Sequence, residues 1–196
     1  MITFKYDKKI EQTVFDDYVK PKKSPEVASL IFLEINEVEI LSERDVIISK
    51  LVSHIENGWQ KVANNFYNKL GKFYGLDISE PDLTCYLIRL DIFPYSYLTN
   101  KEKWFAAPLF GNPADRIRVI MHELCHFFQP LDLPRDIKEA IPVILNDHEA
   151  FQMYSFDRGH GTEEEKKWRK IIWDIYQSGG GFQDIIDKLK KEGILS

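Results

Sequence analysis

The chain has 196 residues, and 44% of them are hydrophobic, which suits one domain with a buried core. Its net charge is −5 with acidic and basic residues mixed, a balance that argues against a nucleic-acid partner, which usually shows as a basic stripe. Its two cysteines are too few for a disulfide framework, and no apolar run approaches the ~20 residues that a membrane helix needs.

The N-terminal residues are too charged for a signal peptide, so we expect a cytoplasmic protein without a membrane partner. Residues 1–41 are predicted to form an irregular arm, and residues 42–196 a single domain. The domain is expected to begin with a long amphipathic helix, because apolar residues recur at helical spacing from near Ser42 onwards. Gly71 or Gly75 is expected to end this helix.

Two strands are predicted to follow the long helix. Residues 84–92 are rich in β-branched and apolar side chains, which is typical of a strand. Residues 103–110 are predicted to form the second strand. Pro108 within it indicates an edge strand, because proline cannot donate a hydrogen bond to a neighbouring strand. Such an edge could pair with an extended peptide.

The rest of the chain is predicted to be helical. A helix is expected over residues 113–128, followed by a helical segment over residues 137–155 that Pro142 would kink. Two more helices are predicted over residues 163–177 and 182–192. This order of elements, with two strands among several helices, predicts an α+β fold.

The predicted helix over residues 113–128 contains the sequence HELCH, a His-Glu-x-x-His motif. His122 and His126 would point the same way on a helix, so their ring nitrogens could meet at one ion at the ~2.0–2.1 Å typical of zinc. Glu123 would face the space beside the ion, where a carboxylate can accept a proton from an activated water. The spacing thus predicts two zinc ligands and one general base. The alternative is a core helix with two hydrogen-bonded histidines.

This motif, placed after an edge strand and before a helix with a glutamate, resembles the gluzincin group of zinc metallopeptidases over about residues 45–155. The resemblance implies a thermolysin-like active site in a compact, single-domain, zincin-like fold. In such a fold the long N-terminal helix and a small edge-stranded sheet pack on the helix of the motif. The resemblance also implies that His122, His126 and a downstream glutamate bind zinc, and that Glu123 is the general base.

A third protein ligand is expected because catalytic zinc sites use three. The continuation FFQPLD lacks the glycine and histidine of the metzincin pattern, so a carboxylate is the better candidate. Glu139, on the first turns of the next helix, would lie back over the motif and is preferred to Glu149. Two alternatives stay open: Glu139 could cap a helix together with Asp136, or Pro142 could begin the helix and leave Glu139 outside it.

Four further residues have candidate roles. His160, or else Tyr154, lies downstream where gluzincins commonly keep a donor for the oxyanion, although an exposed loop histidine and a tyrosine at the core edge are the ordinary interpretations. Asn146 could orient a ligand, or be a plain polar residue at a helix end. Cys125 is expected to be a small apolar core residue.

The sequence therefore predicts zinc-dependent hydrolysis of peptide bonds in a peptide or protein substrate. Zn²⁺ would be held by His122, His126 and Glu139, with Glu123 as general base and His160 as the oxyanion donor. The alternative is a catalytically inactive zinc-binding module with a zincin fold and a regulatory or interaction role. The pattern selects neither a particular substrate nor an oligomeric state.

Overall fold

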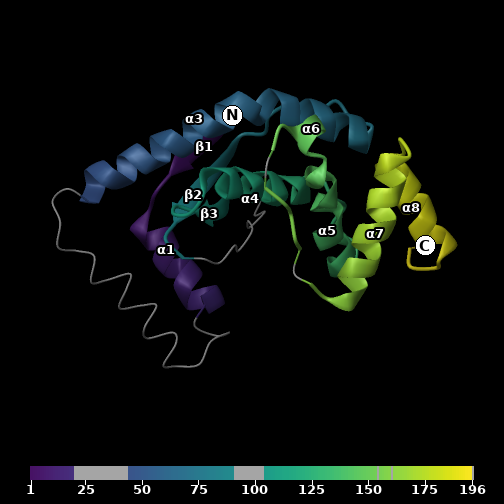
Figure 1. Ribbon diagram of the computed structural model, residues 1–196. Helices are drawn as coiled ribbons and strands as arrows, with labels where there is room; N and C mark the ends of the chain where they lie inside the picture. Colours follow the sequence, from purple (N-terminus) through teal and green to yellow (C-terminus); the bar gives the residue numbers. More distant parts are fainter. Residues whose placement is uncertain (20–43, 91–103, 154, 160, 196) are drawn as a thin grey trace. The chain divides into compact units, whose positions relative to one another are not determined.

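A computed structural model describes most of the chain, with residues 20–43, 91–103, 154, 160 and 196 outside the described part (Figure 1). The chain divides into two compact units. Unit 1 consists of residues 1–59 and 81–116, and unit 2 of residues 60–80 and 117–196. The predicted boundary between residues 41 and 42 lies outside the described residues, so that boundary stays a prediction.

Unit 1 contains a three-stranded parallel sheet with the order β1-β2-β3. The strands are β1 (Ile2–Lys5), β2 (Leu83–Ile88) and β3 (Trp104–Pro108). Strand β3 lies at an edge of this described sheet, as Pro108 predicted. The prediction of an irregular arm is wrong at its start, because β1 pairs with β2 along its whole length.

The middle strand β2 pairs on both sides and is almost entirely apolar, as expected of a strand in a parallel sheet. Cys85 faces Phe4 of β1 and Phe105 of β3 in the register of the sheet, and all three side chains are buried. An adjoining apolar cluster consists of Val14, Phe15, Ile88, Leu90 and Ala106.

A short helix, α1 (Lys8–Val14), follows β1 and carries a buried charge. Asp7 caps it by accepting a hydrogen bond from the backbone of Lys9 at 2.7 Å. The Glu11 side chain is 0% exposed and pairs with Arg89, just beyond β2, at 2.6 Å. Tyr6 also donates to the Glu11 carboxylate, at 3.0 Å. The carboxylate is thus fully paired, which a buried charge requires.

The predicted long helix is confirmed as α3 (Arg44–Tyr74), which has 31 residues. It ends at Gly75, whose φ of +66° places it in the left-handed region that glycine adopts without strain. The C-terminal part of α3 belongs to unit 2, where the Phe66 ring lies 6.3 Å from that of Phe151.

The motif helix is confirmed as α4 (Pro113–His126). The segment after it differs from the prediction of one kinked helix. It consists of α5 (Arg135–Ala140), a 3-10 helix (Ile141–Asn146) and α6 (His148–Phe151). Pro142 is at the start of the 3-10 helix, where its missing N–H and the clash of its ring with the carbonyl group four residues earlier prevent α5 from continuing as a regular α-helix.

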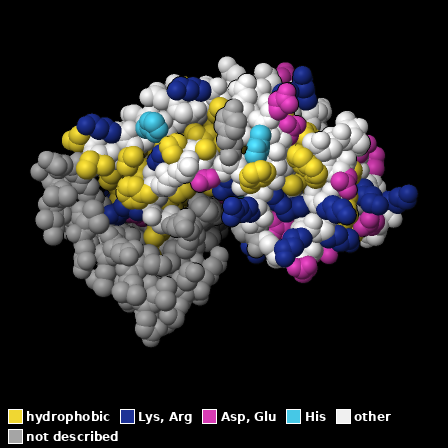
Figure 2. Space-filling view, viewed as in Figure 1, with side chains coloured by type: hydrophobic (Ala, Val, Ile, Leu, Met, Phe, Trp, Pro, Cys, Tyr) yellow, Lys and Arg dark blue, Asp and Glu magenta, His cyan; other side chains and the backbone are white. Residues whose placement is uncertain are grey.

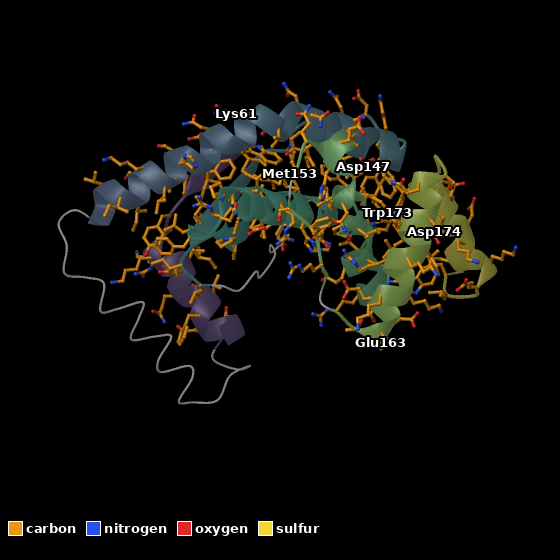
Figure 3. All side chains as sticks on the ribbon, viewed as in Figure 1. Lys61, Asp147, Met153, Glu163, Trp173 and Asp174 are labelled. Atoms are coloured by element: carbon orange, nitrogen blue, oxygen red, sulfur yellow. The ribbon has the colours of Figure 1, made fainter. Side chains whose placement is uncertain are left out.

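The two C-terminal helices, α7 (Glu163–Gln177) and α8 (Phe182–Lys191), follow the prediction closely. Thr162 caps α7 by accepting from the backbone N–H of Glu165, and three glutamates in the first turn, including Glu163, complement the helix dipole (Figure 3). Over α7 and α8, acidic and basic side chains are interspersed on the visible face (Figure 2).

The fold class is α+β and mostly helical, as predicted, with a small parallel sheet. Among the described helices, none has both the length and the apolar character required to cross a bilayer.

Candidate metal centre

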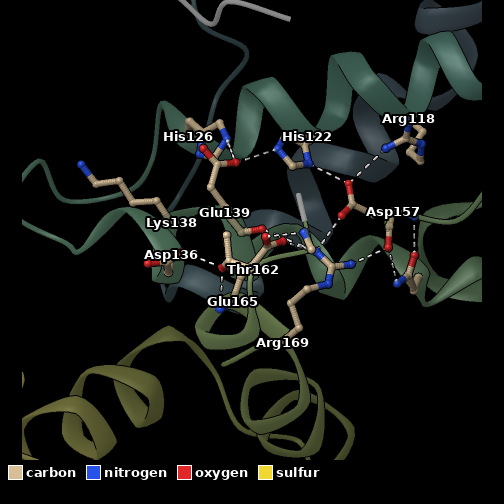
Figure 4. A network of polar contacts seen from close by, with 12 residues as sticks. Arg118, His122, His126, Asp136, Lys138, Glu139, Asp157, Thr162, Glu165 and Arg169 are labelled. Atoms are coloured by element: carbon tan, nitrogen blue, oxygen red, sulfur yellow. Dashed lines mark hydrogen bonds and ion pairs between the residues drawn. The ribbon is translucent and has the colours of Figure 1, made fainter. Parts of the chain in front are cut away.

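The two histidines of the motif lie together at the end of α4 in unit 2 (Figure 4). Their ring centroids are 4.9 Å apart, and their side chains are 10% and 8% exposed. Both rings point their Nε2 atoms at one carboxylate, because Oε2 of Glu139 is 3.4 Å from Nε2 of His122 and 3.4 Å from Nε2 of His126. One ligand atom from each of the three residues lies within 4.8 Å of the other two.

Glu139 reaches the histidines from α5, the helix that follows the motif. Its predicted alternative role in a capping box is not observed, since Pro134 is the N-cap of α5 and no side chain caps it. Glu149 is exposed on α6 and is not part of the group that could hold a metal among the described residues. Of the two predicted carboxylates, the structure therefore brings Glu139 to the histidines.

Each histidine also has an acceptor at its other ring nitrogen. Nδ1 of His122 lies 2.6 Å from Oδ2 of Asp157, and Nδ1 of His126 lies 2.9 Å from Oε1 of Gln129. Hydrogen bonds of this kind place a ring proton on Nδ1, so Nε2 is the nitrogen that can bind a metal once it has lost its own proton. The contacts at Nδ1 thus orient both rings toward Glu139.

Asp157 is buried and is held by three side chains besides His122. Asn146 binds its backbone at both ends, accepting from the N–H at 2.7 Å and donating to the carbonyl oxygen at 3.1 Å. Arg169 donates to the carboxylate at 2.8 Å and also to the carbonyl oxygen, while Arg118 donates at 3.2 Å. Asn146 therefore holds Asp157 in place, and Asp157 in turn orients His122.

Two carboxylates, Asp157 at Nδ1 and Glu139 at Nε2, stabilise the protonated form of His122. Burial lowers the pKa of His122, but the hydrogen bonds to Asp157 and Glu139 outweigh it and raise that pKa to about 10. Burial would raise the pKa of Asp157, but the hydrogen bond from His122 and the charge of Arg169 hold it well below its usual range. Asp157 is therefore a carboxylate at neutral pH, able to accept from the ring.

Glu123, the predicted general base, is 4% exposed and follows His122 on α4. Its charge contributes to the raised pKa of His122, which places it within electrostatic reach of the same ring. Cys125 is buried, and burial raises the pKa of its thiol well above the ordinary value. Cys125 is thus a neutral core residue, as predicted, and its thiol is not available as a thiolate ligand.

The two predicted oxyanion donors, His160 and Tyr154, lie outside the described residues. Near them, Gly159 has a φ of +66°, and the backbone N–H of Gly161 donates to the Glu165 carboxylate at 3.0 Å. A Cβ atom on Gly159 would lie 1.8 Å from Oε1 of Glu165, so glycine is required there by both backbone conformation and space.

The donor set fits a zinc ion. Two imidazole nitrogens and one carboxylate oxygen are a combination that catalytic zinc sites use. The hydrogen-bonded Nδ1 atoms add the outer partners that metal-bound histidines almost always have. The same donors also occur in sites for other divalent metals.

Sequence reasoning missed two residues of this site, Asp157 and Gln129. Gln129 is three residues after His126, a spacing that would have indicated a contact if the helix had been taken to continue past His126. Asp157 is 35 residues from His122 and lies in a loop, where no periodicity connects the two.

The chain was compared with models of known protein families, with curated proteins and with solved structures, and no match was found in any of the three.

Proposed function

We propose that this protein is a zinc-dependent hydrolase of peptide bonds with a gluzincin-type centre in a zincin-like fold. The observation that carries the proposal is the convergence of three donor atoms, Nε2 of His122, Nε2 of His126 and Oε2 of Glu139, at 3.4 Å between each ring and the carboxylate. The acceptors behind both rings support it, because a ring that donates from Nδ1 turns Nε2 toward the place where a metal would bind.

A zinc ion bound by these residues would supply Lewis acidity that polarises a water molecule and a substrate carbonyl. Glu123 accepts the proton of the attacking water and delivers it to the leaving amine, which is general base and then general acid catalysis. Asp157 keeps the His122 ring in position and offsets positive charge on it. His160, or in its place Tyr154, donates to the developing oxyanion. The substrate is a peptide or protein.

The proposal is tested with the variant Glu123→Gln, which keeps the size of the side chain and removes its basicity. The control is Glu149→Gln, which changes an exposed glutamate of the same unit. Bound zinc is measured by elemental analysis, and hydrolysis with a library of internally quenched peptides. Glu123→Gln is expected to bind zinc like the wild type and to lose roughly 10²–10⁴-fold in rate, the usual contribution of a general base.

Two results would count against this function. If Glu123→Gln hydrolysed peptides as fast as the wild type, Glu123 would not be the base. If the wild type bound one zinc ion per chain but cleaved no peptide in the library, the chain would instead be a zinc-binding module without turnover.

A further inference from the structure

Gln129 lies just after α4 and is 7% exposed, so its amide group is almost entirely removed from water. Both ends of the amide have partners. Oε1 lies 2.9 Å from Nδ1 of His126, and Nε2 donates to the backbone carbonyl oxygen of Lys138 at 3.0 Å. One side chain therefore contacts the motif helix and the segment that carries the third candidate ligand.

The partner at Lys138 decides which way the amide faces. A backbone carbonyl oxygen can only accept a hydrogen bond, so the NH₂ group of Gln129 must point toward Lys138. The amide oxygen must then point toward His126, and an oxygen can only accept. Nδ1 of His126 must therefore carry a proton, and in the neutral ring Nε2, which lies 3.4 Å from Oε2 of Glu139, keeps its lone pair.

Lys138 directly precedes Glu139 in α5. The hydrogen bond from Gln129 to the Lys138 carbonyl therefore restrains the backbone one residue before the carboxylate, while the other end of the same amide restrains the ring of His126. One side chain thus restrains both the ring of His126 and the backbone next to Glu139. His122 is oriented separately, by the charged carboxylate of Asp157.

We propose that Gln129 is a positioning residue of the metal centre: it fixes His126 in the tautomer that presents Nε2 and holds that ring in register with Glu139. The role in zinc binding rests on the proposed function, whereas the role in the tautomer does not. A carboxylate at this position could still accept from Nδ1, but it could not donate to the Lys138 carbonyl. The two tasks of Gln129 are thus separable by substitution.

Three variants of the full-length chain make the test. Gln129→Met removes the hydrogen bonds of the amide, including one with Tyr74, at similar volume. Gln129→Glu keeps the acceptor and removes the donor. Gln183→Met is the control, because Gln183 is exposed on α8. The tautomer of His126 is read from long-range ¹H–¹⁵N correlation spectra before and after zinc addition, at a pH where the spectra show the ring to be neutral. Zinc affinity is measured by competition with a chelator.

The wild type, Gln129→Glu and Gln183→Met are expected to show the Nδ1–H tautomer at His126 without zinc, and Gln129→Met is expected to lose it. Zinc affinity should fall by roughly 10–100-fold in Gln129→Met, the usual cost of removing an outer partner of a metal ligand. Gln129→Glu should lose less, because it still orients the ring.

The proposal is overturned if Gln129→Met keeps the Nδ1–H tautomer, or if Gln129→Glu loses it. The second comparison decides the matter even if Gln129→Met does not fold. A wild-type chain that shows the Nδ1–H tautomer but binds no zinc would refute the proposed function and leave the tautomer assignment supported. A chain that binds zinc with equal affinity in all variants would refute the positioning role alone.

Discussion

The substitution Asp157→Asn tests the buried polar network behind His122. It keeps the shape of the side chain and removes its charge. The two hydrogen bonds between the Asn146 side chain and residue 157 involve only the backbone of residue 157, so they persist in the variant. The local backbone should therefore stay in place, and the measured effect should report the carboxylate itself.

The magnitude follows from what the carboxylate holds. It accepts from His122 at 2.6 Å, from Arg169 at 2.8 Å and from Arg118 at 3.2 Å. Removing one partner of a buried ion pair costs about 3–5 kcal/mol, because the other charge stays buried. The Arg118 side chain is 20% exposed and makes the longest of the three bonds, so it contributes least. Arg169 still lies 3.7 Å from Glu165 and His122 lies 3.4 Å from Glu139. We therefore expect the free energy of unfolding of the zinc-free protein to fall by about 3 kcal/mol, the lower end of that range.

The effect should depend on pH in a defined direction. The pKa of Asp157 is lowered in the folded protein, so its contribution is present above its unfolded value of ~3.9 and is lost as the pH falls through the folded value. The pKa of His122 is raised to about 10, so its contribution is complete below ~6.5 and is lost as the pH rises toward about 10. The difference between wild type and variant should be greatest between pH ~4 and ~6.5.

The assay is urea denaturation of the zinc-free chain at several pH values, with Asp174→Asn as the control. Asp174 is exposed on α7, and a surface change of this kind is expected to stay within about 0.5 kcal/mol (Figure 3). If Asp157→Asn were as stable as the control near pH 6, the carboxylate would not hold the network together. A difference that grew between pH ~6.5 and ~10 would contradict the assigned direction of the His122 shift.

Two further predictions concern the third ligand and the buried ion pair of unit 1. Glu139→Gln should lose more zinc affinity than the roughly 10–100-fold typical of an outer partner, whereas Glu149→Gln should bind zinc like the wild type, both measured by chelator competition; the reverse order would assign the third ligand to Glu149. Glu11→Gln should lower the free energy of unfolding by about 3–5 kcal/mol, because it leaves Arg89, whose side chain is 8% exposed, without its counter-charge. A loss below about 1 kcal/mol in urea denaturation would show that the Arg89 charge reaches water.

The long helices were predictable from the sequence, and the short elements were not. Helices α3, α4, α7 and α8 each show a helical period of apolar residues over ten or more positions, and the structure contains all four. Strand β1 has only four residues, and its partner β2 begins about 80 residues later in the chain. Nothing local distinguishes such a strand from a loop, because its stability comes from the pairing.

In the segment after α4, the helical period of apolar residues was recognised, but the way in which Pro142 divides the segment was not. The helical period over residues 137–155 is present, and the prediction allowed for a kink at Pro142. The structure instead changes to a 3-10 helix at that point and begins a new short helix at His148. Periodicity cannot distinguish an α-helix with a kink from two helices joined by a 3-10 turn, since both place the same apolar residues inward.

Much of the candidate metal centre was also predictable. His122 and His126 follow from a spacing within one helix, and Glu139 from the return of the next helix over the motif. Asp157 could not be predicted, because its position depends on contacts with Asn146 and Arg169 that only the folded chain makes. Local spacing thus identified the candidate ligands, whereas tertiary contacts supply the groups that orient one of them.

The most direct test of the account is a crystal structure of the zinc-soaked full-length chain, with anomalous difference maps recorded on both sides of the zinc absorption edge. We expect one zinc peak, bound by Nε2 of His122, Nε2 of His126 and the carboxylate of Glu139 at about 2.0–2.2 Å. A peak elsewhere, no peak at all, or a fourth protein ligand that completes the coordination would contradict a catalytic zinc centre at the end of α4.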